Sequence, residues 1–198
     1  QPTQRESSQL FSETSSNSGL WIPVAKATLE ALSLRPTHAM LQPFYHPARV
    51  KLVMGGERSG KSYHGALQVV ARHKLGRLFW LVAEEYETCI PELEYIVEFL
   101  RQLDAIDPSD RSEISWAKRG SKSVRTRDGV LIETRSADDY RRIAEKAPDG
   151  ILGCEVGRWQ WETFLRVNSR LAQQRGWAWL SGSFESSYGW QVEKWRQW

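Results

Sequence analysis

The chain has 198 residues, of which 40% are hydrophobic, and its formal net charge is +3 at pH 7. This size and composition suit one domain with a sizeable core, and the charge is too small to indicate nucleic-acid binding by itself. No stretch reaches the roughly 18 apolar residues of a membrane span or forms a secretory signal, and the two cysteines form no disulfide framework or zinc motif.

The N-terminal part of the chain shows little regular patterning. Residues 1–19 are rich in Ser, Gln, Thr and Glu without an apolar face, so we predict a disordered or loosely attached segment. One domain is then predicted over residues 20–198. It begins with a short helix over Leu20–Ser33, because Ala25, Leu29 and Leu32 recur at helical spacing. Arg35–Pro47 contains three prolines and is typical of a loop with a helical turn.

An alternation of strands and helices follows. Val50–Met54 is a short apolar strand, and the next residues up to Lys74 have the pattern of a helix, with Gly76 as its stop signal. Leu78–Ala83 is apolar on both faces, as in a buried parallel strand. Pro91 then opens a second helix with apolar residues at helical spacing.

The second half of the chain contains a hairpin signal and then returns to alternation. Asp128-Gly129 lies between two strand-like runs, Lys122–Arg127 and Val130–Arg135, which favours a β-hairpin. The later predicted elements are a strand over Gly150–Cys154, a helix over Trp161–Gln174 ended by Gly176, and a strand over Trp177–Leu180. We therefore predict an α/β fold, with a mostly parallel central sheet flanked by helices and an inserted β-hairpin.

The strongest motif joins the first strand to the first long helix of this series. It has the form G-x-x-x-x-G-K-S and consists of Gly55, Gly56, Glu57, Arg58, Ser59, Gly60, Lys61 and Ser62. In such a phosphate loop, glycines let backbone N–H groups point at phosphates, the lysine lies between the β- and γ-phosphates, and the serine hydroxyl is a Mg²⁺ ligand. The flanking strand and helix provide the expected context, so we predict binding of ATP with Mg²⁺. Arg58 is either a solvated loop charge or a contact to the γ-phosphate.

Hydrolysis also needs acids that hold the Mg²⁺ shell and orient the attacking water. The usual solution is an apolar strand that ends in Asp-Glu, and here the matching strand ends in Cys154-Glu155. We predict that Glu155 handles the water and contributes to the metal site. Because a thiol is a poor ligand for Mg²⁺, Glu155 carries both tasks, Asp149 reaches in from the start of the strand, or another acid such as Glu84 or Glu85 does so.

The chain resembles the ATPase domain of the large terminase subunit of tailed bacteriophages, from about Pro36 to Trp198. Four segments carry the resemblance: the arginine-bearing loop Gly56–Ser62, the strand and turn over Leu78–Glu87, the segment Ile132–Asp139 that leads to the acidic motif, and Ser181-Gly182-Ser183-Phe184-Glu185. The sequence departs from the family at Cys154 and at Ala144-Glu145. The resemblance implies a P-loop NTPase of the ASCE/RecA-like class that hydrolyses ATP.

The resemblance also implies roles for residues outside the loop. Gln42 is similar in position to a glutamine that reads the adenine edge, although a polar surface residue explains it equally well. Ser181, Gly182 and Ser183 would sense the γ-phosphate and couple hydrolysis to DNA movement. The candidates for an arginine that acts on a neighbouring subunit are Arg135, Arg141 and Arg142.

The implied partners are double-stranded viral DNA, the portal, the small terminase subunit and further copies of the chain in a ring. The implied location is the cytoplasm of the infected bacterial host. No carboxylate cluster of a nuclease is visible, so we expect an ATPase segment without the nuclease domain. A basic stretch could follow a DNA backbone, but a solvated hairpin or a subunit contact fits it too. Its charged residues are Lys118, Arg119, Lys122, Arg125 and Arg127.

Two other functional classes stay open at this point. A P-loop kinase would need an acceptor site and an arginine-rich lid, and neither is evident in the sequence. A nucleotide-binding switch that does not hydrolyse ATP would explain the cysteine at position 154.

Overall fold

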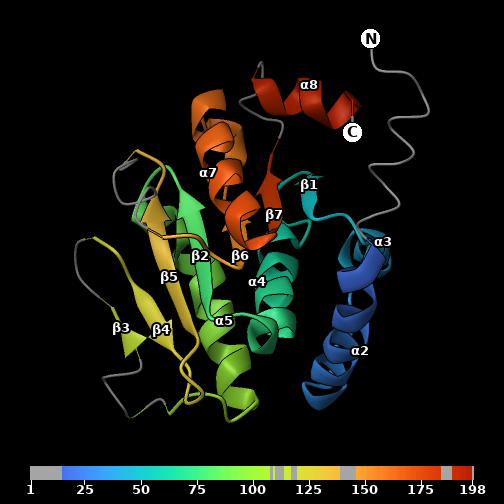
Figure 1. Cartoon of the computed structure of the whole chain (residues 1–198), viewed down its shortest axis with the longest axis vertical. Coiled ribbons are helices and arrows are strands. Elements are labelled where there is room, and N and C mark those ends of the chain that lie inside the picture. The colour runs from blue at the N-terminus through green and yellow to red at the C-terminus, as the bar shows by residue number, and fades with distance from the viewer. Residues whose placement is uncertain are drawn as a thin grey trace.

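The computed structural model describes residues 15–107, 109, 114–116, 120–138, 146–183 and 189–197. Its centre is a twisted sheet with helices on both faces (Figure 1). The described part of the chain contributes seven strands, in the order β1-β7-β6-β2-β5-β4-β3. They are β1 (Val50–Met54), β2 (Leu78–Ala83), β3 (Ile114–Ser115), β4 (Ser123–Arg125), β5 (Leu131–Ser136), β6 (Gly150–Gly153) and β7 (Trp177–Gly182).

The strands that the alternation predicted form the parallel part of this sheet. Strands β1, β7, β6, β2 and β5 pair in parallel, whereas β4 pairs antiparallel with β5 and with β3. The α/β prediction is confirmed. The predicted hairpin exists between β4 and β5, with Gly129 at φ 86°. It is not a separate insertion, because β5 pairs with β2 along its whole length and is therefore part of the central sheet.

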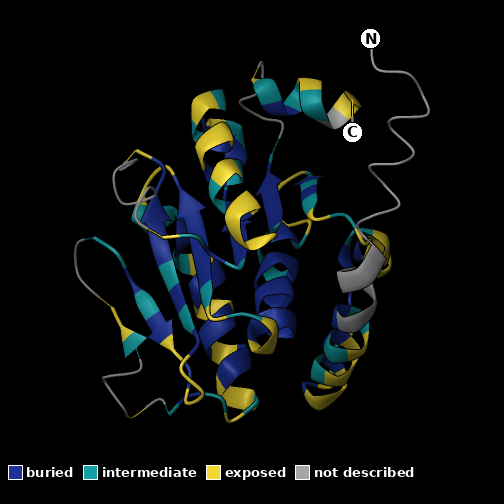
Figure 2. Ribbon diagram, in the orientation of Figure 1, coloured by how far each residue is buried: buried dark blue, intermediate teal, exposed yellow. Residues whose placement is uncertain are grey.

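The two faces of the sheet hold two apolar cores, because alternate residues of buried strands point to opposite sides. One core lies under α4 (Lys61–Arg72) and α5 (Ile90–Gln102), and it includes Phe79, Leu81, Leu152 and Trp179. The other lies under α7 (Trp161–Gln174), and it includes Trp80, Val82, Ile151 and Leu180. Buried positions run continuously through the central strands (Figure 2).

The remaining helices cover the outside. Helix α2 (Ser15–Ala31) packs on α4, as does the shorter α3 (His38–Tyr45). Residues 15–19, which we predicted to belong to a loosely attached segment, form the start of α2, and residues 1–14 lie outside the described part. Helix α8 (Trp190–Gln197) seats Trp190 on Trp161, and the Trp190 indole N–H donates to the Trp159 carbonyl. Single turns of 3-10 helix are η1 (His73–Leu75), η2 (Tyr86–Cys89) and η3 (Val156–Arg158).

Two glycines predicted as helix stops have a different physical role. Gly76 is extended, with φ −155° and ψ −179°, and the left-handed residue after α7 is Arg175 rather than Gly176. Both glycines are instead required by close approach to Asp149. A Cβ atom on Gly76 would lie 2.6 Å from the Cβ of Asp149, and one on Gly176 would lie 2.7 Å from its carbonyl oxygen.

None of the helices in the described part of the chain is long and apolar enough to cross a membrane.

Candidate nucleotide-binding site

The phosphate loop lies at the C-terminal edge of the parallel strands, between the end of β1 and the start of α4. Its turn depends on two residues with left-handed backbone, Arg58 at φ 56° and Gly60 at φ 84°. Gly60 is the N-cap of α4, so the unpaired N–H groups of the first helical turn face the loop. The Gly55 N–H donates to the Gly182 carbonyl at 3.2 Å, which ties the loop to the end of β7.

Lys61 is the buried cation of this loop. Only 7% of its surface is exposed, and its ammonium group donates to the carbonyls of Gly55 at 2.9 Å and Gly56 at 2.7 Å. These bonds hold the ammonium group inside the curve of the loop, where a phosphate group would be recognised. By contrast, the Arg58 side chain is exposed to solvent. An exposed arginine at this place is free to meet a γ-phosphate or a neighbouring chain.

The end of β6 brings further predicted residues to the same edge. Glu155 follows the strand and adopts left-handed backbone at φ 47°, a conformation that costs free energy for a residue with a side chain. The Ser181 hydroxyl donates to the Gly153 carbonyl at 3.0 Å, so β7 and β6 are linked where they leave the sheet. The structure thus places Glu155, Ser181 and Gly182 beside the phosphate loop, with Ser183 next along the chain.

A carboxylate that the sequence reasoning missed lies in the same region. Glu92, in the first turn of α5, is buried, and its carboxyl group lies close to the Ser62 hydroxyl and the Cys154 thiol. Burial raises the pKa of Glu92, the contacts with Ser62 and Cys154 partly oppose the rise, and the nearby Glu155 charge adds to it. A signal was present: Glu92 falls four residues before Ile96, so helical spacing puts an acid on the apolar face of α5.

Cys154 cannot replace the missing acid. Its side chain is fully buried in the core under α4 and α5. Burial raises the pKa of the Cys154 thiol well above its ordinary value, and neighbouring Cys89 and Glu92 raise it further. The group is therefore a neutral thiol at pH 7, which is a poor partner for a hard cation.

The other acids proposed for this role do not meet Ser62 in the structure. Asp149 lies at the opposite, N-terminal edge of the sheet, where its Oδ2 accepts the N–H groups of Arg77 at 2.7 Å and Leu78 at 3.0 Å. The proposal that Asp149 reaches in from the start of β6 is therefore wrong, because the whole length of β6 separates the Asp149 carboxylate from the phosphate loop. Glu84 and Glu85 follow β2 and are exposed to solvent.

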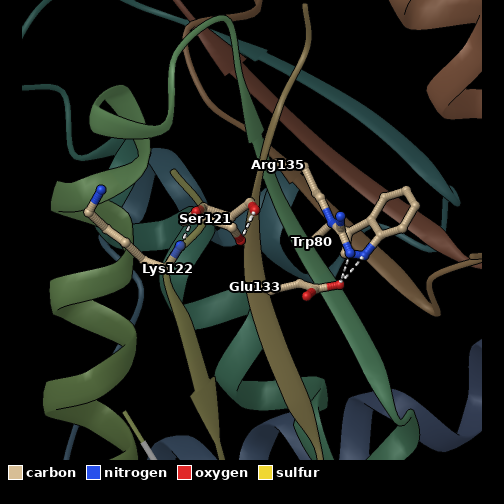
Figure 3. A network of polar contacts seen from close by, with 6 residues as sticks. Trp80, Ser121, Lys122, Glu133 and Arg135 are labelled. Carbon is tan, nitrogen blue, oxygen red and sulfur yellow. Dashed lines mark hydrogen bonds and ion pairs between the residues drawn. The ribbon is translucent and has the colours of Figure 1, made fainter. Parts of the chain in front are cut away.

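The candidate arginines for action on a neighbour divide into two groups. Arg141 and Arg142 lie outside the described residues. The guanidinium group of Arg135 is buried and pairs with Glu133 at 2.5 Å, and Glu133 also accepts the Trp80 indole N–H (Figure 3). The Arg135 guanidinium lies 5.3 Å from the centre of the Trp80 ring. In this conformation Arg135 is held by its own chain and is not presented to another subunit.

The basic stretch around β4 exposes fewer positive charges than its sequence indicates. Lys122 is buried, with its ammonium group 3.5 Å from Glu87, and Arg127 pairs with Asp104 at 2.8 Å. Arg125 is exposed, while Lys118 and Arg119 lie outside the described residues. Lys122 is therefore not one of the exposed cations of this stretch, and the choice between a DNA path, a solvated hairpin and a subunit contact stays open.

Gln42 lies on the exposed side of α3, and its role in reading adenine stays a prediction.

The segment before α3 is fixed to the loop through His64. The His64 ring bonds to the Gly60 carbonyl at 2.7 Å through Nδ1, and its Nε2 accepts the Thr37 N–H at 3.2 Å. Neutral His64 therefore joins the start of α3 to the phosphate loop.

The donor set fits a Mg²⁺ ion that arrives with a nucleotide. The described residues hold no group of three or more His, Cys, Asp or Glu side chains placed to bind a metal. Mg²⁺ in nucleotide sites usually takes one or two carboxylates together with phosphate oxygens and water, so a larger cluster is not needed. Ser62 and the Glu92 and Glu155 carboxylates provide such a set, and Glu92 Oε2 is a buried oxygen with no hydrogen-bond partner in the described structure.

The chain matches no protein-family model and no curated protein. Among solved structures it is similar to the ATPase domain of the large terminase of Thermus phage P74-26, with a TM-score of 0.64 and 20% identity over 83% of this chain and 71% of that chain. An arginine-to-alanine mutant of the same domain gives a TM-score of 0.62 and 22% identity over the same shares. At these identities the likeness establishes the fold: the chain has the architecture of a large terminase ATPase domain.

Proposed function

We propose that the chain is the ATP-hydrolysing motor domain of a phage large terminase, which drives double-stranded DNA into a procapsid. The observation that carries this proposal is a complete G-x-x-x-x-G-K-S loop between β1 and α4 of a chain that has the fold of a terminase ATPase domain. The Glu155 carboxylate and the Ser181-Gly182-Ser183 segment lie at the same edge of the sheet as this loop. The partners of this proposal are the DNA, the portal, the small terminase subunit and other copies of the chain in a ring.

The residues divide the work of hydrolysis. Lys61 and the N–H groups at the start of α4 bind the β- and γ-phosphates, and Gln42 bonds to the adenine edge. Ser62 and the neighbouring acids hold the Mg²⁺ ion, which neutralises negative charge on the phosphate oxygens when bound. Glu155 orients the attacking water and accepts its proton, while Arg58 meets charge that develops on the γ-phosphate. The Ser181 to Gly153 hydrogen bond gives the coupling segment a direct link to the strand that carries Glu155.

A nucleotide-binding switch is the second candidate, and a specific observation favours it. The residue at the usual aspartate position is a buried neutral thiol, so a weakened metal site would bind nucleotide without turning it over.

ATP binding and phosphate release, measured with and without double-stranded DNA, test both candidates. For the motor, we expect DNA-stimulated phosphate release. Lys61→Ala should weaken ATP binding by at least about 100-fold, and Glu155→Ala should bind ATP but lose at least about 100-fold in turnover. Glu162→Ala, an exposed acid on α7, is the control and should match wild type.

Each other result has a definite meaning. ATP binding with no turnover in the presence of DNA supports the switch, and phosphate transferred to a small acceptor supports a kinase. If Lys61→Ala binds ATP as well as wild type does, the phosphate loop is not a nucleotide site and both candidates fail.

A further inference from the structure

Strand β6 ends in a thiol at the place where a P-loop ATPase normally has its Mg²⁺-shell aspartate. Cys154 belongs to the core on the α4 and α5 side of the sheet, so the position still faces the first turn of α4, where Ser62 lies. Position 154 is therefore suitably placed for a metal ligand, but its side chain carries no negative charge. A substitute acid has to come from an element that packs against both β6 and α4.

Helix α5 is such an element, and its first turn carries Glu92. The helix packs along α4, and the preceding turn η2 ends at Cys89, which contacts Cys154. Glu92 is only 4% exposed. Its carboxyl group lies close to both Ser62, the predicted Mg²⁺ ligand, and Cys154, the residue that replaces the aspartate. A carboxyl group is therefore already present beside position 154.

The carboxyl group of Glu92 is also incompletely satisfied. Its Oε2 atom is inaccessible to solvent and has no hydrogen-bond partner among the described residues. A buried carboxylate oxygen without a partner is costly, and proteins normally avoid it unless a cation or another ligand completes the site. The negative charge of Glu155 adds to the rise in the pKa of Glu92, and a divalent cation beside Glu92 would favour its charged form.

We propose that Glu92 supplies the acidic group of the Mg²⁺ site in place of the missing aspartate, acting together with Ser62. The proposal rests on the proposed nucleotide-dependent function, because the metal enters with the phosphates. Glu92 then takes the metal-binding task of the missing aspartate and Glu155 orients the water, so the two tasks fall mainly to two carboxylates from different elements.

The alternative is a purely structural acid, protonated and bonded between α4 and α5. The two roles differ in their dependence on the metal. A non-hydrolysable fluorescent ATP analogue is titrated into the full chain in EDTA and in excess Mg²⁺, and the ratio of the two dissociation constants gives the Mg²⁺ gain. For wild type we expect tighter binding with Mg²⁺.

Glu92→Gln keeps the size of the side chain and removes its charge. We expect its affinity in EDTA to match wild type, while the Mg²⁺ gain falls by at least about tenfold. Mn²⁺ bound in the presence of the analogue, counted by electron paramagnetic resonance, should fall in parallel. Cys154→Asp in the Glu92→Gln background should restore most of the gain. Glu94→Gln, an exposed acid on the same helix, is the matched control and should leave it unchanged.

Three results would overturn the proposal. They are an unchanged Mg²⁺ gain in Glu92→Gln, an equal loss of affinity with and without Mg²⁺, and a wild-type protein that gains nothing from Mg²⁺. If Glu92→Gln does not fold, Glu92→Asp replaces it, because it keeps the charge and shortens the reach, and the same loss is expected. A wild-type chain that binds no nucleotide defeats the proposed function itself, whereas binding with an unaltered Glu92→Gln defeats only the role of Glu92.

Discussion

The polar groups at the two ends of the parallel strands are satisfied to different degrees. At the N-terminal end, the Asp149 carboxylate accepts two backbone N–H groups, and the buried cations Lys51 and Arg72 lie against the rings of Trp21, Trp177 and Trp179. At the C-terminal end, Glu92 Oε2 has no partner in the described structure, and Glu155 holds a strained backbone.

This difference suggests that the polar groups at the N-terminal end of the strands stabilise the fold, whereas those at the C-terminal end serve ligand binding. Removing a charged group that the chain itself pairs or hydrogen-bonds should change the stability of the fold and leave ligand binding intact. Removing a charged group that has no partner within the chain should weaken ligand binding and leave the stability of the fold unchanged or improved. Each prediction below compares a residue at one end with a residue at the other.

The largest effect on stability should come from Asp149→Ala. The substitution leaves the N–H groups of Arg77 and Leu78 without an acceptor between β2 and β6, which we expect to cost about 2–4 kcal/mol. Urea unfolding measures the loss. Glu85→Ala at the other end of β2 removes an exposed acid and should stay within about 0.5 kcal/mol. A folded Asp149→Ala protein with weakened nucleotide binding would contradict the structural role of Asp149.

The next effect tests how tightly each end is packed. A Cβ atom on Gly150 would lie closer than 3.0 Å to the Trp177 ring, which is itself held by Arg72 and Phe79. Gly150→Ala should therefore destabilise the protein by about 1–3 kcal/mol. A Cβ atom on Gly56 in the phosphate loop would meet nothing within 4 Å, so Gly56→Ala should change the free energy of unfolding by less than about 0.5 kcal/mol. Equal losses of unfolding free energy in the two variants would contradict the inference that the two ends of the strands are packed differently.

These contrasts mark what the sequence could and could not predict. The phosphate loop, β1, β2 and α5 were predictable because the loop motif and the apolar runs are local signals. The alternative in which Asp149 reaches in to the metal site is wrong, and the sequence did not reveal this because its partners, Arg77 and Leu78, are joined to it only by the pairing of β6 with β2. Glu92 was missed because its meeting with Ser62 and Cys154 depends on how α5 packs against α4 and β6, which spacing within one helix does not specify.

A third comparison concerns two buried lysines at opposite ends of the strands, Lys51 and Lys61. Lys61 donates to the open phosphate loop, whereas Lys51 donates to the Phe44 carbonyl and lies 5.0 Å from the Trp21 ring centre. Burial, with a smaller contribution from Arg72, lowers the pKa of Lys51 to about 7 from its usual 10.5. Lys51→Met keeps the volume, and Phe44 keeps the bond from Gln68. We expect a gain on the order of 1–2 kcal/mol at pH 7 from removing a buried charge.

The pH dependence identifies the cause of this gain. Between pH 7 and 10.5 the unfolded chain keeps the Lys51 proton that the folded chain has released, so wild-type stability rises with pH in that window. The advantage of Lys51→Met should be greatest below pH 7 and should shrink as the pH approaches 10.5. Unfolding by urea across this range measures it, and an advantage that does not vary with pH would assign the effect to packing instead.

The smallest effect compares two strained residues. Glu155 at the C-terminal end and Arg175 at the N-terminal end both have left-handed backbone, at φ 47° and φ 52°. Glycine adopts this conformation without a steric penalty, so Glu155→Gly and Arg175→Gly should each stabilise the protein by roughly 0.5–1 kcal/mol. Thermal unfolding detects both gains. ATP turnover separates the two variants, because only Glu155→Gly removes the carboxylate that we propose orients the attacking water. We expect turnover to collapse in Glu155→Gly and to persist in Arg175→Gly. If both variants lose turnover equally, the loss in Glu155→Gly is not specific to the Glu155 side chain. If both keep it, the attacking water is held by another residue at that edge of the sheet.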